Sequence, residues 1–181
     1  MSIWFTSDHH FGHKNIVAHC ARPFSSVEEM DDKLIANWNS QVCKSDTVYH
    51  LGDFSLSDPK PYLDRLNGRV NLIIGNHDRT TKASLGQFVS AQDVLMFRHD
   101  GQEIWLSHYA HLRWPKSHHG VPHLFGHSHG QLNGSLPAGA MMFDVGVDCF
   151  DFKLWSLQEV LTKMAKIFLW RPPVLSNGVG R

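Results

Sequence analysis

The sequence predicts a layered, mixed α/β domain, and two observations lead to this class. In the first half of the chain short apolar strands alternate with helices, whereas in the second half strands follow one another closely. Alternation favours parallel strands covered by helices, and clustered strands favour an α+β arrangement. The length of 181 residues fits one domain, which we expect over residues 1–170, followed by a C-terminal tail over 171–181.

Three strand–loop–helix units are expected in the first half. The segment 25–29 has the pattern of a capping box, and apolar residues recur every four positions behind it, as in an amphipathic helix. Asp58-Pro59 predicts the start of a second helix, and Gly68 predicts its end. The strands of these units are expected at residues 3–7, 47–51 and 70–74.

The second half is expected to be richer in strands. Asp100-Gly101 is a two-residue hairpin signal between two apolar segments. A second capping box at Ser156 predicts a last helix, which Arg171-Pro172-Pro173 would end. The strands are expected at residues 94–98, 103–106, 123–125 and 141–147.

The composition excludes some partners and points to one kind of chemistry. Lys and Arg number 17 and Asp and Glu also 17, which argues against an extended nucleic-acid footprint or an acidic membrane. No apolar run reaches the roughly 18–20 residues that span a bilayer, and no leader pattern is visible, so a cytoplasmic protein is expected. Histidine occurs 14 times without a terminal run, which favours metal or acid–base chemistry.

Side chains able to bind a metal follow five of the predicted strands. The ends of such strands meet at one edge of a sheet, where open α/β folds place ligand sites. Each residue alone fits an ordinary turn or a core histidine, but the five together favour a site. Oxygen and imidazole donors without thiolate suit Mn, Fe, Zn, Ni or Co better than Mg or Ca. The five residues are Asp8, Asp53, Asn76, His108 and His127.

The order of the motifs around these residues resembles a known superfamily. Asp8-x-His10, Gly52-Asp53, Gly75-Asn76-His77-Asp78, His108 and Gly126-His127-Ser128-His129 together are similar to the calcineurin-like metallophosphoesterases. The segment 7–16 with Arg22-Pro23-Phe24 further resembles its short bacterial and phage-type members. The resemblance implies a β-sandwich of two mixed sheets flanked by helices, in four layers α-β-β-α.

The resemblance also implies a dinuclear centre that hydrolyses phosphoesters. Mn is the favoured metal, with Fe, Zn, Ni or Co as alternatives. A hydroxide that bridges the two ions would attack phosphorus, and a histidine would act as general acid on the leaving oxygen. The implied roles are Asp8, His10 and His129 at the first ion, Asn76, His108 and His127 at the second, Asp53 as the bridge and His77 as the acid.

Two motif differences from the protein-phosphatase branch of the superfamily reduce the range of expected substrates. Serine/threonine protein phosphatases carry Asp-Arg-Gly after the second motif and glutamate where this chain has Asp78. We therefore expect a compact phosphodiesterase for small or nucleotide-like esters. A nuclease acting on single-stranded nucleic acid and a non-catalytic metal-binding scaffold stay open as alternatives. Substrate contacts are expected from His13, Arg22, His111 and Arg113.

Overall fold

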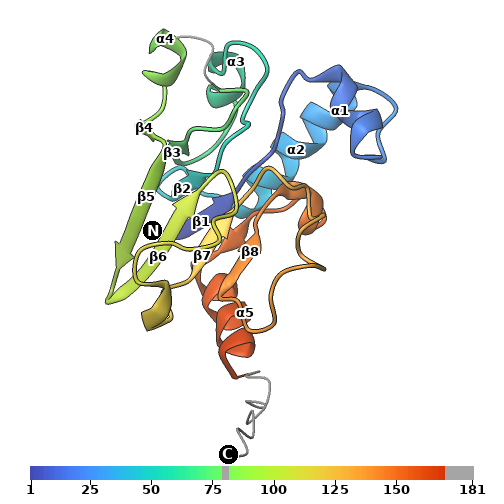
Figure 1. The fold of residues 1–181 in the computed structure, drawn as a ribbon. Helices are drawn as coiled ribbons and strands as arrows, with labels where there is room; N and C mark the ends of the chain where they lie inside the picture. Colours follow the sequence, from blue (N-terminus) through green and yellow to red (C-terminus); the bar gives the residue numbers. More distant parts are fainter. Residues whose placement is uncertain (79–81, 170–181) are drawn as a thin grey trace, which may run out of the picture.

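The computed structural model describes residues 1–78 and 82–169, and it contains two mixed sheets together with helices (Figure 1). The first sheet has the strand order β4-β3-β2-β1-β9, and the second has the order β5-β6-β7-β8. Only the β1–β9 and β5–β6 pairs are antiparallel among the described strands. The strands are β1 (Ile3–Thr6), β2 (Thr47–His50), β3 (Arg69–Ile73), β4 (Ser90–Gln92), β5 (Val94–His99), β6 (Gln102–Ser107), β7 (His123–Phe125), β8 (Met142–Asp144) and β9 (Trp155–Ser156).

The two longest helices of the described part begin at serine caps. The Ser26 side chain accepts a hydrogen bond from the Glu29 backbone N–H at 3.2 Å, and Ser156 does the same for Glu159 at 3.2 Å. None of the helices in the described part has the length and apolarity that crossing a membrane requires. The helices are α1 (Lys14–His19), α2 (Val27–Gln41), α3 (Lys60–Leu63), α4 (Lys82–Leu85) and α5 (Leu157–Leu169), with 3-10 turns at η1 (Ser117–His119) and η2 (Val147–Cys149).

The mixed α/β class and the predicted strands are confirmed, with differences in two elements. The helix expected after Asp58-Pro59 is only the single turn α3, and the chain continues in turns to Gly68. The strand expected over 141–147 ends at Asp144, whose carboxylate accepts the Gly146 N–H at 2.7 Å and so turns the chain. The tail expected over 171–181 lies outside the described residues.

Two apolar cores hold the layers together. The first contains α2 and one face of the first sheet, including Trp38 and Val48. The second contains residues of both sheets, and the Phe5 ring of β1 meets the Phe97 ring of β5 edge-on at 5.4 Å between centroids. Helix α5 adds Val160 and Met164 to this second core. The first sheet is thus buried on both faces, while the full α-β-β-α order stays a prediction.

Strand direction brings the chain segments after the strands to one edge. β1, β2 and β3 run parallel, with Thr6 paired to His50 and His50 to Leu72. β6 and β7 are also parallel, with Leu106 paired to Leu124. The loops that follow these five strands carry the predicted metal ligands, and α5 lies at the opposite end of the molecule from α3 and α4 (Figure 1).

One buried histidine makes the stability of the second sheet dependent on pH. His123 on β7 is fully buried, with its Nε2 atom 2.9 Å from the Ser107 hydroxyl. Burial lowers the pKa of His123 to about 3. Because the unfolded chain has the ordinary histidine pKa of about 6.5, it binds the proton more readily, so stability is lost as the pH falls below that value.

We expect His123→Leu to flatten the pH dependence of unfolding. The His123 contribution amounts to about 1.4 kcal/mol per pH unit between about pH 6 and pH 4, measured by denaturant unfolding of the metal-free protein. The exposed His118 supplies a control, since His118→Gln should leave the slope unchanged. Equal slopes for the wild type and His123→Leu would contradict the assignment.

Candidate metal centre

Most of the predicted ligands sit at sharp left-handed turns. The described chain has ten non-glycine residues with positive φ, and five of them are predicted ligands. Such a backbone costs of order 1–3 kcal/mol per residue and clusters at functional sites. The turns aim side chains from several loops toward one point. The five are Asp8 (φ 60°), His10 (φ 53°), Asp53 (φ 56°), His127 (φ 65°) and His129 (φ 47°).

Two motif glycines let these loops approach one another. A Cβ atom on Gly75 would collide with the backbone and carboxylate of Asp53. A Cβ atom on Gly126 would lie 2.7 Å from Oδ2 of Asp8. The absence of a side chain at both positions is therefore what allows the carboxylates to be covered by neighbouring backbone.

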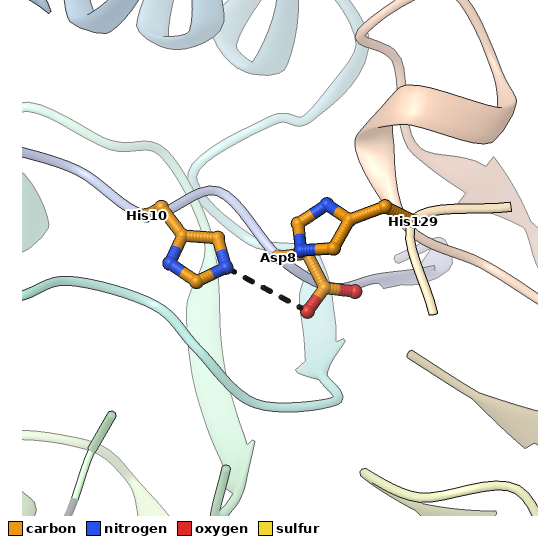
Figure 2. A group of neighbouring side chains, drawn as sticks. All are labelled: Asp8, His10 and His129. Atoms are coloured by element: carbon orange, nitrogen blue, oxygen red, sulfur yellow. Dashed lines mark ion pairs between the residues drawn. The ribbon is translucent and has the colours of Figure 1, made fainter. Parts of the chain in front are cut away.

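Asp8, His10 and His129 form the first half of the centre. One donor atom of each lies within 4.8 Å of the others. Figure 2 shows the His10 ring directed at the Asp8 carboxylate, with the His129 ring beside them, and Nε2 of His10 is 4.0 Å from Oδ1 of Asp8. Residues from the β1 and β7 loops, and so from both sheets, thus meet in one three-residue group.

Asp53 connects this group to a second one. Its Oδ2 atom lies 3.5 Å from Nε2 of His10 and also 3.5 Å from Nε2 of His108. His127 completes a group of ligand atoms with Asp53 and His108, again within 4.8 Å. Oδ1 of Asn76 is 3.1 Å from Nε2 of His108. The structure therefore brings together all seven predicted ligands, with Asp53 between the two halves.

The donor set fits metal cations. Nε2 of His10 is buried and has no hydrogen-bond partner among the described residues. Nδ1 of His108 lies 2.7 Å from the Leu51 carbonyl oxygen, so the ring donates there and its Nε2 lone pair faces Asp53. Lone pairs that converge in this way repel one another unless a cation lies between them. Asp, Asn and His are ligands that divalent transition metals accept.

The electrostatics of the buried groups show the same need for positive charge. Burial raises the pKa of Asp8 to about 7 and lowers the pKa of His10 to about 3. Burial alone would lower the pKa of His108, but its hydrogen bond to Asp53 and the charges of Asp8 and Asp53 raise it to about 9. His108 in turn outweighs burial and holds the pKa of Asp53 well below its usual range. A cation bound between these groups would offset the cost of burying the two carboxylates.

Two further buried carboxylates hold the ligand loops in place. Asp78 accepts hydrogen bonds from the backbone N–H groups of Asp53 at 2.7 Å and Gly75 at 2.8 Å. Asp144 accepts from the Ser128 hydroxyl at 2.5 Å and from the Gly130 N–H at 3.0 Å. Asp78 belongs to a motif that the sequence showed, whereas Asp144 has no signal beyond its position at the end of an apolar strand.

Asp148 and Arg22 support the first half of the centre. Oδ2 of Asp148 lies 2.7 Å from Nδ1 of His129, which leaves Nε2 of His129 directed toward Asp8. Arg22 binds both Asp148 oxygens at 2.8 Å and donates to the carbonyl oxygens of Asp8 and His9. Its guanidinium is fully buried, so Arg22 lies behind the ligand loop rather than facing substrate as expected.

The other predicted substrate residues lie in different places. Nδ1 of His13 is 3.4 Å from Nδ1 of His10, at the edge of the first half of the centre. His111 is directed away, since its Nδ1 atom accepts the indole N–H of Trp105 at 3.0 Å. Arg113 is exposed on the loop after His108. Contact with substrate stays a prediction for these residues.

His77 lies beside the centre and is partly exposed. Its side chain is 37% exposed, and its Nε2 atom lies 3.9 Å from Oδ2 of Asp53. The His77 backbone N–H donates to Oδ1 of Asp53 at 3.0 Å, which fixes the residue next to the predicted bridge. Geometry alone also groups His77 with His10 and Asp53 as a set of ligand atoms. Both an acid and a ligand role are compatible with this position.

Comparisons with known proteins give relatives of unassigned activity. No protein-family model matches the chain. It is 50% identical over 82 residues to the uncharacterized protein MJ1445 of Methanocaldococcus jannaschii, covering 42% of this chain and 47% of that protein. It is 28% identical over 180 residues to the gene 66 protein of Mycobacterium phage D29, covering 82% and 89%. The chain thus spans less than half the length of the Methanocaldococcus relative.

A solved structure shares the fold. The protein of unknown function AQ665 from Aquifex aeolicus has a TM-score of 0.72 and 27% identity, covering 90% of this chain and 98% of its own. Pseudomonas putida nuclease MPE has a TM-score of 0.45 with 21% identity over 70% of this chain and 60% of that one. Yfce, a phosphoesterase from E. coli, has a TM-score of 0.39 with 18% identity over 81% and 78%. TM-scores as low as those of the nuclease and the phosphoesterase do not establish a shared fold.

We expect Asp148→Ala to lower metal affinity about 10- to 100-fold, because His129 loses the acceptor that orients it. Titration of the metal-free protein with Mn²⁺ measures the change. Asp148→Asn keeps an acceptor oxygen and should lose less, which guards against an unfolded alanine variant. Asp151 is 83% exposed, and Asp151→Ala is the matched control. Unchanged affinity in Asp148→Ala would contradict this role.

Proposed function

We propose that this chain is a metal-dependent phosphoric ester hydrolase with a dinuclear centre, acting on small or nucleotide-like phosphodiesters. The observation that carries the proposal is the convergence of seven metal-capable side chains from five strand ends, with Asp53 between the two halves. The order of these residues is that of the metallophosphoesterase motifs. The proposal includes the four-layer sandwich, Mn as the favoured metal and no membrane partner.

Charge explains why such a centre suits a phosphate ester. Two divalent ions bring four positive charges and Asp8 and Asp53 bring two negative ones, which leaves about two positive charges before substrate and water bind. Arg22 is paired with Asp148, so its positive charge is neutralised within the protein and does not add to that of the centre. When bound, the ions supply stabilisation of phosphoryl charge and a water of lowered pKa.

His77 is the residue that we assign to the leaving group. Its backbone is held by Asp53, while its side chain is partly exposed beside the centre. A leaving alkoxide develops negative charge, and a neighbouring imidazolium stabilises it by donating a hydrogen bond and then the proton. With a diester this step releases one alcohol, which takes the proton from His77, while the second ester group stays on phosphorus.

We expect chelation to abolish hydrolysis of bis(4-nitrophenyl) phosphate, and Mn²⁺ to restore it. The ions supply the positive charge that binds phosphate, so their removal also removes that charge. Release of nitrophenolate measures the rate. Parallel assays on a monoester and on single-stranded RNA and DNA separate the classes. A metal-loaded protein that cleaves none of them supports the scaffold, and equal rates on oligonucleotides support the nuclease.

We expect His77→Ala and Asp53→Asn to separate chemistry from metal binding. His77→Ala should lower kcat by about 100-fold or more while both ions stay bound, since a general acid contributes about 10²–10⁴. Asp53→Asn should lose metal, because it removes a charge shared by both halves. Elemental analysis of the purified variants gives the metal content, and His118→Ala is the exposed control. Loss of metal in His77→Ala would show that His77 is a ligand.

A further inference from the structure

The loop after His108 carries aromatic and basic residues, and the structure separates their tasks. The indole N–H of Trp114 donates to the Val121 carbonyl oxygen at 2.8 Å, and its ring packs on His123 at 5.1 Å between centroids. His111 is bonded to Trp105. These rings therefore belong to the packing of the second sheet and are not free to face the centre.

Tyr109 is placed differently from the other aromatic residues of this loop. Its hydroxyl donates to Oδ1 of Asn76 at 3.2 Å. Its ring lies 4.6 Å from the His127 ring and 5.0 Å from the His108 ring, edge-on to both. Tyr109 thus contacts three of the residues expected at the second ion.

Exposure shows which side of the centre is open. Asp8 and His10 are buried at 0% and 2% exposure, whereas Asn76 and His127 are exposed. Tyr109 is 47% exposed on this same side. A substrate that reaches the centre from solvent therefore arrives over the second half, where the Tyr109 ring is already anchored at two points.

We infer that Tyr109 forms an aromatic wall of the substrate position and selects phosphodiesters that carry a nucleobase. This inference rests on the proposed function. An aromatic side chain held in one orientation loses little conformational entropy when a planar group stacks on it. Stacking of one base on an aromatic side chain corresponds to about tenfold or more in affinity.

The Tyr109 ring, rather than the charge of Lys116, is what this loop adds beside the centre. The basic residue Lys116 on the same loop is paired with Glu103, with Nζ–O distances of 2.6 and 2.8 Å. The positive charge for the phosphate would come from the centre itself, and Tyr109 adds an apolar face next to it. One phosphodiester and one base is the ligand chemistry that this pairing recognises.

The test compares two diesters that differ only in the base, adenosine 5′-(methyl phosphate) and methyl ribofuranoside 5-(methyl phosphate), on the Mn²⁺-loaded protein. We expect the wild type to show a KM about tenfold lower for the adenosine ester. Tyr109→Phe keeps the ring and should keep this ratio. Tyr109→Leu removes the ring and should bring the ratio close to one. Both tyrosine variants lose the hydrogen bond to Asn76, so the comparison between them isolates the ring.

Controls make each result decisive. Leu112 is 90% exposed on the same loop, so Leu112→Ala should behave as the wild type. Equal KM values for the two esters in the wild type, or an unchanged ratio in Tyr109→Leu, would overturn the inference while leaving the hydrolase intact. Loss of metal in both tyrosine variants would overturn it in favour of a role in positioning Asn76. If the protein hydrolyses none of the three esters, including the nitrophenyl diester, the proposed function is overturned and the inference with it.

Discussion

Two carboxylates that are kept out of water, those of Asp8 and Asp53, set the conditions for the rest of the structure. They are 0% and 2% exposed, and burial of an ionised group costs several kcal/mol unless donors replace the lost water. The replacement donors are backbone N–H groups, from His127 to Asp8 at 2.9 Å and from His77 to Asp53 at 3.0 Å. Because these donors lie in other loops, solvating the carboxylates draws those loops together.

The ligand loops reach this arrangement with positive φ angles at five of the predicted ligands, which is an unfavourable backbone conformation. Left-handed backbone at the ligands is tolerated only where the surroundings hold it, and a second group of buried carboxylates does so. Asp78 and Asp144 each bind backbone N–H groups of ligand loops, and Asp148 binds a ligand side chain directly. The candidate metal centre is therefore supported by a connected hydrogen-bond network behind the predicted ligands, as metal ligands generally require.

The sequence predicts which metal-capable side chains come together, because each follows a short apolar strand and parallel strands end at one edge. The supporting residues are a different case. Arg22 and Asp148 are 126 positions apart, and such a long-range pair leaves no local pattern in a single sequence. The strand expected over 141–147 is shortened by hydrogen bonds of Asp144, which apolar periodicity does not register. No sequence pattern distinguishes the aromatic residues after His108 from one another, whereas their hydrogen bonds separate Tyr109 from Trp114.

The centre takes its side chains from both sheets, with Asp8, His10, Asp53 and Asn76 following strands of the first sheet and His108, His127 and His129 following strands of the second. Any cation held there ties the sheets to each other at their shared edge, as a crosslink does. Its binding free energy is then added to the free energy that keeps the chain folded. Loss of the cation would reach beyond the chemistry, since it removes a bond that joins segments more than a hundred residues apart, from Asp8 to His129.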